Sequence, residues 1–147
     1  MNKKTTTHNI ATTYVQIGVI IGQVNLVETL INDVIVQHYG DPSNEERKSR
    51  FSRDILHGGM IRLDDKLRLL KLVADAKDIE MAGTIVKDFR QWKIIRNTVA
   101  HGIPMRDREN EIRIALNGEL HDINALRRGF VKRQDRITAF LTLLKQR

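Results

Sequence analysis

Apolar residues recur at helical spacing along most of the chain. Between Ile10 and Tyr39 one apolar stripe returns every three or four residues, which predicts a single long helix. The stripe consists of Ile20, Val24, Val27, Ile31, Val34 and Ile35. Residues 1–9 are polar and lack this periodicity, so we expect a flexible N-terminal tail ahead of one domain that covers residues 10–147.

Four more helices follow from the same kind of pattern. Ser43 and Glu46 match the capping box of a second helix, which we expect to run to about Leu56 and to stop at His57-Gly58-Gly59. The third helix is expected over 63–76, the fourth from about residue 79 or 81 to Ala100, and the last over about 124–144.

One segment changes period. Ile112, Ile114 and Leu116 alternate with more polar residues, and Asn117-Gly118 is the strongest short signal for a hairpin turn. We therefore expect a small two-stranded β-hairpin near residues 111–122. The predicted fold class is all-α, an antiparallel bundle of about five helices with this hairpin attached.

Composition narrows the classes of function. The formal net charge is +7 and 15 of the 25 cations are arginine, which suits a polyanion as partner. Cysteine is absent, which excludes disulfides, thiolate metal sites and a cysteine nucleophile and fits a reducing cytoplasm. The apolar stretch from Tyr14 to Gly22 is too short to cross a bilayer, so we expect no membrane partner.

The candidate chemistry lies at the end of the fourth predicted helix. Arg96 falls between Phe89 and Trp92 on the apolar stripe of the helix, whereas a solvated arginine would lie on the opposite face. Asn97 and His101 are four residues apart and so are neighbours on the adjoining flank. We expect the polar ends of Arg96, Asn97 and His101 to border one cleft. His38 and His121 have no carboxylate or histidine partner at metal-ligand spacing, so we assign no metal site and no cofactor.

The segment Arg96-Asn97-Thr98-Val99-Ala100-His101 resembles the motif of the HEPN superfamily, in which an arginine, a polar residue and three further residues precede a histidine. HEPN domains are all-helical and include many ribonuclease toxins. The resemblance covers roughly the whole chain in architecture, and the Gly-x-Pro that follows His101 adds to it.

The resemblance implies a metal-independent endoribonuclease, a toxin or antiviral effector, that works as a homodimer with a shared site. The ribose 2′-hydroxyl would attack the adjacent phosphorus and leave a 2′,3′-cyclic phosphate. His101 would transfer a proton, Arg96 would hold the phosphate, and Asn97 would orient either the histidine or the phosphate by hydrogen bonding. An antitoxin protein is a possible partner, although Ile103 stands where some members carry a tyrosine that a nucleotidyltransferase antitoxin modifies.

Plainer interpretations remain open. Arg96 is alternatively an interior arginine paired with Glu28 or Asp33, and Glu28 can also serve to position Arg96 or His101. His101 is alternatively a helix-end residue that the helix dipole favours. The corresponding alternative function is a catalytically inactive HEPN-like helical module that binds a protein partner or a nucleotide.

Several cations are candidates for contact with RNA. Lys93, Arg106 and Arg108 lie close to the motif in sequence and are expected to contact the phosphate backbone. The basic run over 127–136 is expected to form a solvated face of the last helix. A regulator that binds nucleic acid without cutting it is disfavoured, because no helix-turn-helix signature is present.

Overall fold

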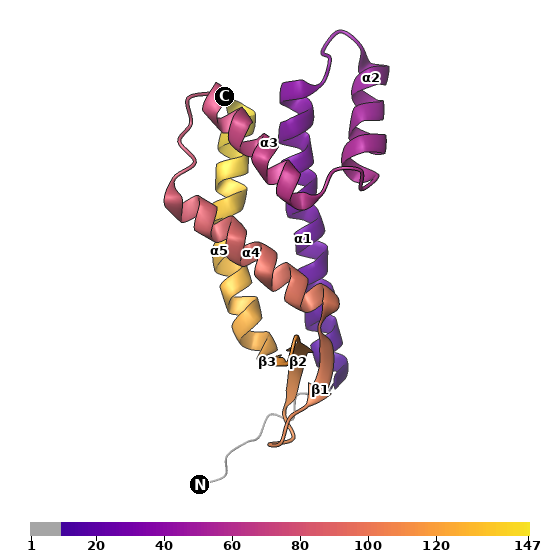
Figure 1. The fold of residues 1–147 in the computed structure, drawn as a ribbon, viewed down its shortest axis with the longest axis vertical. Coiled ribbons are helices and arrows are strands. Elements are labelled where there is room, and N and C mark those ends of the chain that lie inside the picture. The colour runs from indigo at the N-terminus through magenta and orange to yellow at the C-terminus, as the bar shows by residue number, and fades with distance from the viewer. Residues whose placement is uncertain (1–9) are drawn as a thin grey trace.

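The computed structural model describes residues 10–147, so the tail predicted for residues 1–9 lies outside the described part. Within that part the chain forms five α-helices, one π-helical segment and three short strands (Figure 1). In chain order these are α1 (Ile10–Tyr39), α2 (Glu45–Arg50), η1 (Phe51–His57), α3 (Leu63–Ala76), α4 (Gly83–His101), β1 (Ile103–Arg106), β2 (Ile112–Leu116), β3 (Glu119–His121) and α5 (Ile123–Gln146). The all-α fold with a small hairpin is thus confirmed.

The two longest helices, α1 and α5, lie side by side along the length of the molecule, and α3 and α4 pack across them (Figure 1). They run parallel, because Gln16 bonds Asn124 near their first turns and Lys145 pairs with Asp33 near their last. This pair therefore differs from the antiparallel arrangement that we expected. The predicted stripe of α1 is the centre of the core, and each of its six side chains is at most 3% exposed.

The second helix is capped differently from the prediction. Asn44 is the N-cap, and its side-chain oxygen accepts the backbone N–H of Arg47. Ser43 instead donates both its backbone N–H and its hydroxyl to Asp41 in the preceding turn. The capping box expected from Ser43 is therefore wrong, because the aspartate two residues earlier already binds the serine.

The same helix changes its winding before it ends. α2 passes directly into η1, which ends at His57 before the two glycines, one residue beyond the expected end. Gly59 adopts a φ of +76°, a conformation that favours glycine and turns the chain toward α3. π-Helical turns are rare and often occur at functional sites, and this one delivers His57 to the pocket described below.

The remaining helices begin close to their expected positions. α3 spans the predicted residues, whereas α4 begins at Gly83, later than expected. The delay has a local cause, since Asp78 adopts a φ of +52° and the Ile79 amide bonds back to Ala74 at the end of α3. α5 begins at Ile123 because Asp122 accepts the amides of the second and third helical residues.

The hairpin is present, with a third strand that we did not predict. Asn117 (φ 52°) and Gly118 (φ 79°) form its turn with the left-handed backbone that a type I′ turn requires. β1 pairs antiparallel with β2, which places Pro104 on an edge strand, where a missing N–H is tolerated. The sheet packs beneath the end of α4, so the strands hold the segment that follows His101 (Figure 1).

The first helix is more apolar than the short stretch from Tyr14 to Gly22 suggested. By length and composition alone, α1 is long and apolar enough to cross a membrane, and its most apolar window has a mean hydropathy of 1.6. However, 44% of that window is buried inside the fold. Its place at the centre of the bundle therefore accounts for part of its hydrophobicity.

Candidate functional site

Arg96 is held by its own chain on two sides. Its Nη2 atom lies 3.4 Å from Glu28 Oε1 on α1, and its Nη1 atom donates to Asn97 Oδ1 at 3.0 Å. The side chain of Arg96 is 34% exposed and that of Glu28 is 25% exposed. Of the two acids considered from the sequence, Glu28 is thus the partner, while Asp33 pairs with Lys145. Two contacts fix the guanidinium and leave further N–H donors free for a ligand.

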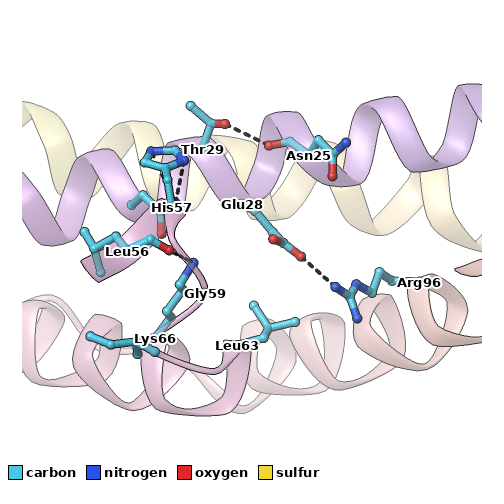
Figure 2. A pocket seen from close by; sticks show the side chains of 11 residues that line it. Asn25, Glu28, Thr29, Leu56, His57, Gly59, Leu63, Lys66 and Arg96 are labelled. Atoms are coloured by element: carbon cyan, nitrogen blue, oxygen red, sulfur yellow. Dashed lines mark hydrogen bonds and ion pairs between the residues drawn. The ribbon is translucent and has the colours of Figure 1, made fainter. Parts of the chain in front are cut away.

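A cleft of about 320 Å³ opens between α1, the end of η1, α3 and α4. Figure 2 shows Glu28 reaching across it to Arg96, while Lys66 rises from the opposite wall beneath His57. The residues that line this Arg96 pocket are Asn25, Glu28, Thr29, Asn32, Leu56, His57, Gly59, Ile61, Leu63, Lys66 and Arg96. Its walls are mostly polar, with seven polar or charged side chains beside the apolar Leu56, Ile61 and Leu63.

Two buried polar residues form the back of the pocket. Lys66 is 6% exposed, and its Nζ atom donates to the Leu56 carbonyl oxygen at 2.8 Å. Burial lowers the pKa of the Lys66 ammonium, and the nearby Glu28 carboxylate opposes this. Asn32 is 2% exposed, and its Nδ2 atom lies 3.4 Å from the Nδ1 atom of His57. With Lys66 and Arg96 against Glu28, cations outnumber acids in the pocket.

His101 does not share this pocket within one chain. It is exposed at the last residue of α4 and is absent from the pocket wall. Five residues along an α-helix turn the side-chain direction by about 140°, so Arg96 faces inward and His101 faces outward. The structure therefore brings Arg96 and Asn97 together and leaves His101 on another face, unlike the single cleft that we expected.

The cations proposed for RNA contact have separate surroundings. Lys93 forms an ion pair with Asp64 at the start of α3. Arg106 is exposed and donates to the Asn110 carbonyl oxygen at 3.1 Å in the loop between β1 and β2. Arg108 lies in the same loop, is exposed, and makes no ion pair with any residue in the range 10–147. None of the three lines the Arg96 pocket.

Sequence reasoning missed the buried lysine. Lys66 lies three residues after Leu63 and four before Leu70, so it occupies the apolar stripe of α3 as Arg96 occupies that of α4. The same test that singled out Arg96 would have found it. His57 was expected to be an exposed helix end; it is exposed, but it also lines the pocket.

A second hollow brings together cations from two helices. The α4–α5 groove, of about 770 Å³, is lined by Thr84, Lys87, Asp88, Arg90, Gln91, Lys132, Arg133 and Arg136. Asp88 is 5% exposed and accepts both prongs of the Arg136 guanidinium. That hydrogen bonding, helped by the charges of Arg133 and Lys132, lowers the pKa of Asp88. The basic run of α5 is therefore one wall of a cationic groove, in addition to being solvated.

One group of carboxylates has the proximity that a metal ion needs. Asp107, Glu109 and Glu111 place oxygen atoms within 4.8 Å of one another in the loop between β1 and β2. The Asp107 side chain already accepts the backbone N–H groups of Glu109 and Glu111 and the Nε–H of Arg113. These bonds lower the pKa of Asp107 and fold the loop, which accounts for the cluster.

Comparisons with known proteins assign no function to this site. No protein-family model, no curated protein and no solved structure matches the chain. The site must be judged on its own residues.

Proposed function

We propose that this protein is a metal-independent endoribonuclease whose site is completed by a second copy of the chain. The observation that supports it best is the fixed guanidinium of Arg96, held by Glu28 and Asn97 at the mouth of an open polar pocket. A guanidinium held in this way can receive a phosphate without first being ordered. The residue that would move protons, His101, ends the same helix.

The chemistry follows from the residue types. The ribose 2′-hydroxyl attacks the adjacent phosphorus, the bond to the leaving 5′-oxygen breaks, and a 2′,3′-cyclic phosphate and a 5′-hydroxyl result. His101 takes the 2′-hydroxyl proton or gives one to the leaving oxygen, because an imidazole can act as either a base or an acid. Arg96 stabilises the negative charge that grows on the phosphate oxygens. Asn97 holds the guanidinium through its side-chain oxygen.

A second copy of the chain would bring together Arg96 and His101, which lie on different faces of α4 within one chain. Ile94 and His101 lie about 20° apart around α4, so they share its outward stripe. Ile94 is 50% exposed, and Ile103 and Met105, just beyond His101, are 69% and 45% exposed. An apolar rim around an exposed histidine is typical of a surface that another protein covers. In a two-fold dimer, His101 of one copy would approach the Arg96 pocket of the other.

The α4–α5 groove supports RNA as the substrate. It presents five cations against one carboxylate, and that carboxylate is already paired with Arg136. Contacts from such cations to phosphates do not depend on sequence and weaken with salt. A role as a toxin or antiviral effector, with an antitoxin protein as regulator, belongs to this proposal through the motif that Arg96 and His101 share with HEPN domains.

The first test is cleavage of total RNA by the purified protein in excess chelator, followed by analysis of the cut ends. We expect cutting with 2′,3′-cyclic phosphate and 5′-hydroxyl ends, and loss of cutting in Arg96→Ala and His101→Ala variants that retain their circular dichroism spectra. His38→Ala is the matched control, since His38 is also an exposed histidine near the end of a helix. Intact RNA with the unaltered protein, or equal cutting by the variants, would contradict the proposal.

A second candidate function rests on one observation. In a single chain Arg96 is paired with Glu28 while His101 faces solvent, which is the geometry expected of a structural arginine and a catalytically inactive helical module. Such a module would bind a protein partner or a nucleotide at the same pocket. It predicts that Arg96→Ala lowers stability and that no RNA is cut.

A further inference from the structure

The Arg96 pocket contains two buried acceptor atoms that receive no hydrogen bond from the chain. Glu28 Oε1 and Asn32 Oδ1 are both buried, and neither accepts a hydrogen bond from any residue between 10 and 147; Glu28 Oε1 has only the ion-pair contact with Arg96 Nη2 at 3.4 Å. Asn32 as a whole is 2% exposed, and both residues line the pocket. They are four apart on α1, so their side chains lie one turn from each other on one wall. A buried acceptor without a donor is destabilising, and a ligand that donates to it would recover that cost.

The facing wall provides the opposite kind of group. The Lys66 ammonium has three N–H donors and uses one of them on the Leu56 carbonyl oxygen. The Glu28 carboxylate is close enough to raise the pKa of Lys66 against the effect of burial. The pocket therefore places one donor group, the Lys66 ammonium, beside two acceptors, from Glu28 and Asn32, with the Arg96 guanidinium next to them.

This pattern distinguishes among the four RNA bases. The pairing edge of guanine carries one acceptor, O6, followed by two donors, N1–H and the 2-amino group. Adenine has one donor and one acceptor there, cytosine has one donor and two acceptors, and uracil places a donor between two acceptors. Only guanine offers the complement of one donor and two acceptors, and enzymes that isolate a single base commonly recognise this edge.

We propose that the Arg96 pocket recognises a guanine base of the RNA substrate. Lys66 would donate to O6, while Glu28 and Asn32 would accept from N1–H and the 2-amino group. Leu56, Ile61 and Leu63 supply apolar wall for the base faces, and the cavity of about 320 Å³ is of the size that holds a nucleotide-sized group. Arg96 lines the same pocket and would bind the adjoining phosphate. The inference therefore rests on the proposed nuclease activity and adds a base specificity to it.

Single-stranded oligonucleotides with one guanine, and otherwise A, C and U, provide the cleavage test. We expect cutting beside the guanine, and roughly tenfold slower cutting when inosine, which lacks the 2-amino group, replaces it. Replacement by 7-deazaguanine keeps the pairing edge and should change nothing. Asn32→Leu and Lys66→Met should weaken the preference for guanine, while Thr29→Ala, a pocket residue that bonds only to the Asn25 carbonyl oxygen, should not.

A binding measurement separates this inference from the nuclease proposal. Equilibrium dialysis with GMP, IMP, AMP, CMP and UMP should show preference for GMP that Asn32→Leu removes, whether or not any RNA is cut. Cutting without base preference would overturn the inference and leave the nuclease. Selective GMP binding without RNA cleavage would overturn the nuclease and assign the pocket to a free guanine nucleotide. No preference in either assay, with all variants folded by circular dichroism, would overturn the guanine site altogether.

Discussion

The two faces of α4 differ in how firmly they hold their polar side chains. On the inner face Arg96 is two-thirds covered and fixed by Glu28 and Asn97. At the outer end His101 is exposed and stands beside exposed apolar side chains, Ile94 and Ile103. One residue is already positioned by its own chain, and the other is not.

In the proposed nuclease, this difference would give the two residues separate tasks. A group that stabilises charge acts best when it is held rigidly, which the inner face achieves. A group that transfers protons must reach the reacting oxygens, and in one chain His101 points away from the pocket that holds Arg96. In the proposed nuclease, a second copy of the chain would bring the two faces together.

The largest expected effect is on the outer face. His101→Ala should lower the rate of RNA cleavage by about 10²–10⁴-fold, the usual contribution of a proton-transfer residue. Its free energy of unfolding should change by no more than about 0.5 kcal/mol, since the side chain is exposed. Cleavage kinetics and urea unfolding measure the two quantities. A large loss of stability would remove the contrast between the faces.

On the inner face, substitution of Arg96 should lower both the rate of RNA cleavage and the free energy of unfolding. Arg96→Ala should lower cleavage by about 10²–10³-fold, comparable with removing one donor from an oxyanion site. It should also lower the free energy of unfolding by about 1 kcal/mol, because Glu28 loses its partner in a partly covered ion pair. Arg96→Lys keeps the positive charge but loses the planar guanidinium with its paired N–H donors. Compared with Arg96→Ala, it should restore stability better than activity. Full activity in Arg96→Lys would contradict the role given to the guanidinium.

The junction between α4 and β1 is closely packed around Gly102. A Cβ atom on Gly102 would come to 2.2 Å from Ile114 Cγ2 and 2.4 Å from the Thr98 carbonyl oxygen. Gly102→Ala should therefore lower the free energy of unfolding by about 1–3 kcal/mol, the usual cost of overpacking. Gly83→Ala is the matched control, because a Cβ there meets no atom within 4 Å. Equal effects of the two variants on thermal unfolding would contradict the close approach.

The Asp88–Arg136 pair joins α4 to α5 and gives a pH dependence. The pKa of Asp88 is lower in the folded chain than in the unfolded chain, chiefly through the Arg136 hydrogen bonds. Its contribution is thus present above the unfolded value of about 3.9 and is lost as the pH falls through the folded pKa. Asp88→Asn should cost about 1–2 kcal/mol at pH 7 and reduce the loss of stability between pH 4 and pH 2. An unchanged acid profile would contradict the role of this pair.

The smallest effect concerns RNA binding in the α4–α5 groove. The double variant Arg90→Ala/Lys132→Ala should weaken binding of single-stranded RNA and lower the slope of log K against log salt concentration by about 1.4. Arg47→Ala/Arg50→Ala on α2 removes the same charge outside this groove and should leave the slope close to its original value. Equal slopes for both variants would show that net charge matters and the groove does not.

Residues whose role is set by local spacing could be predicted from the sequence. The stripe of α1, the turn at Asn117-Gly118 and the bounds of α3 depend on periodicity and turn chemistry, and all three are confirmed. The cap at Asn44 was missed because Asp41 competes for Ser43, a contact between neighbours that a spacing rule ignores.

Features that depend on how helices are placed could not be predicted in this way. The parallel course of α1 and α5 and the addition of β1 to the hairpin come from tertiary packing. Glu28 was foreseen as one of two partners for Arg96, but only the crossing of α1 and α4 selects it over Asp33. The divergence of Arg96 and His101 was within reach of the sequence, since it follows from the helical angle alone.

The most direct test of the central claim is activity of a mixed dimer. Arg96→Ala and His101→Ala chains with different affinity tags are expressed together, and only the species with both tags is purified. If each site takes Arg96 from one copy and His101 from the other, this species has one intact site of two and should cut RNA at roughly half the rate of the unaltered dimer. A mixed dimer as inactive as either variant alone would contradict the shared site.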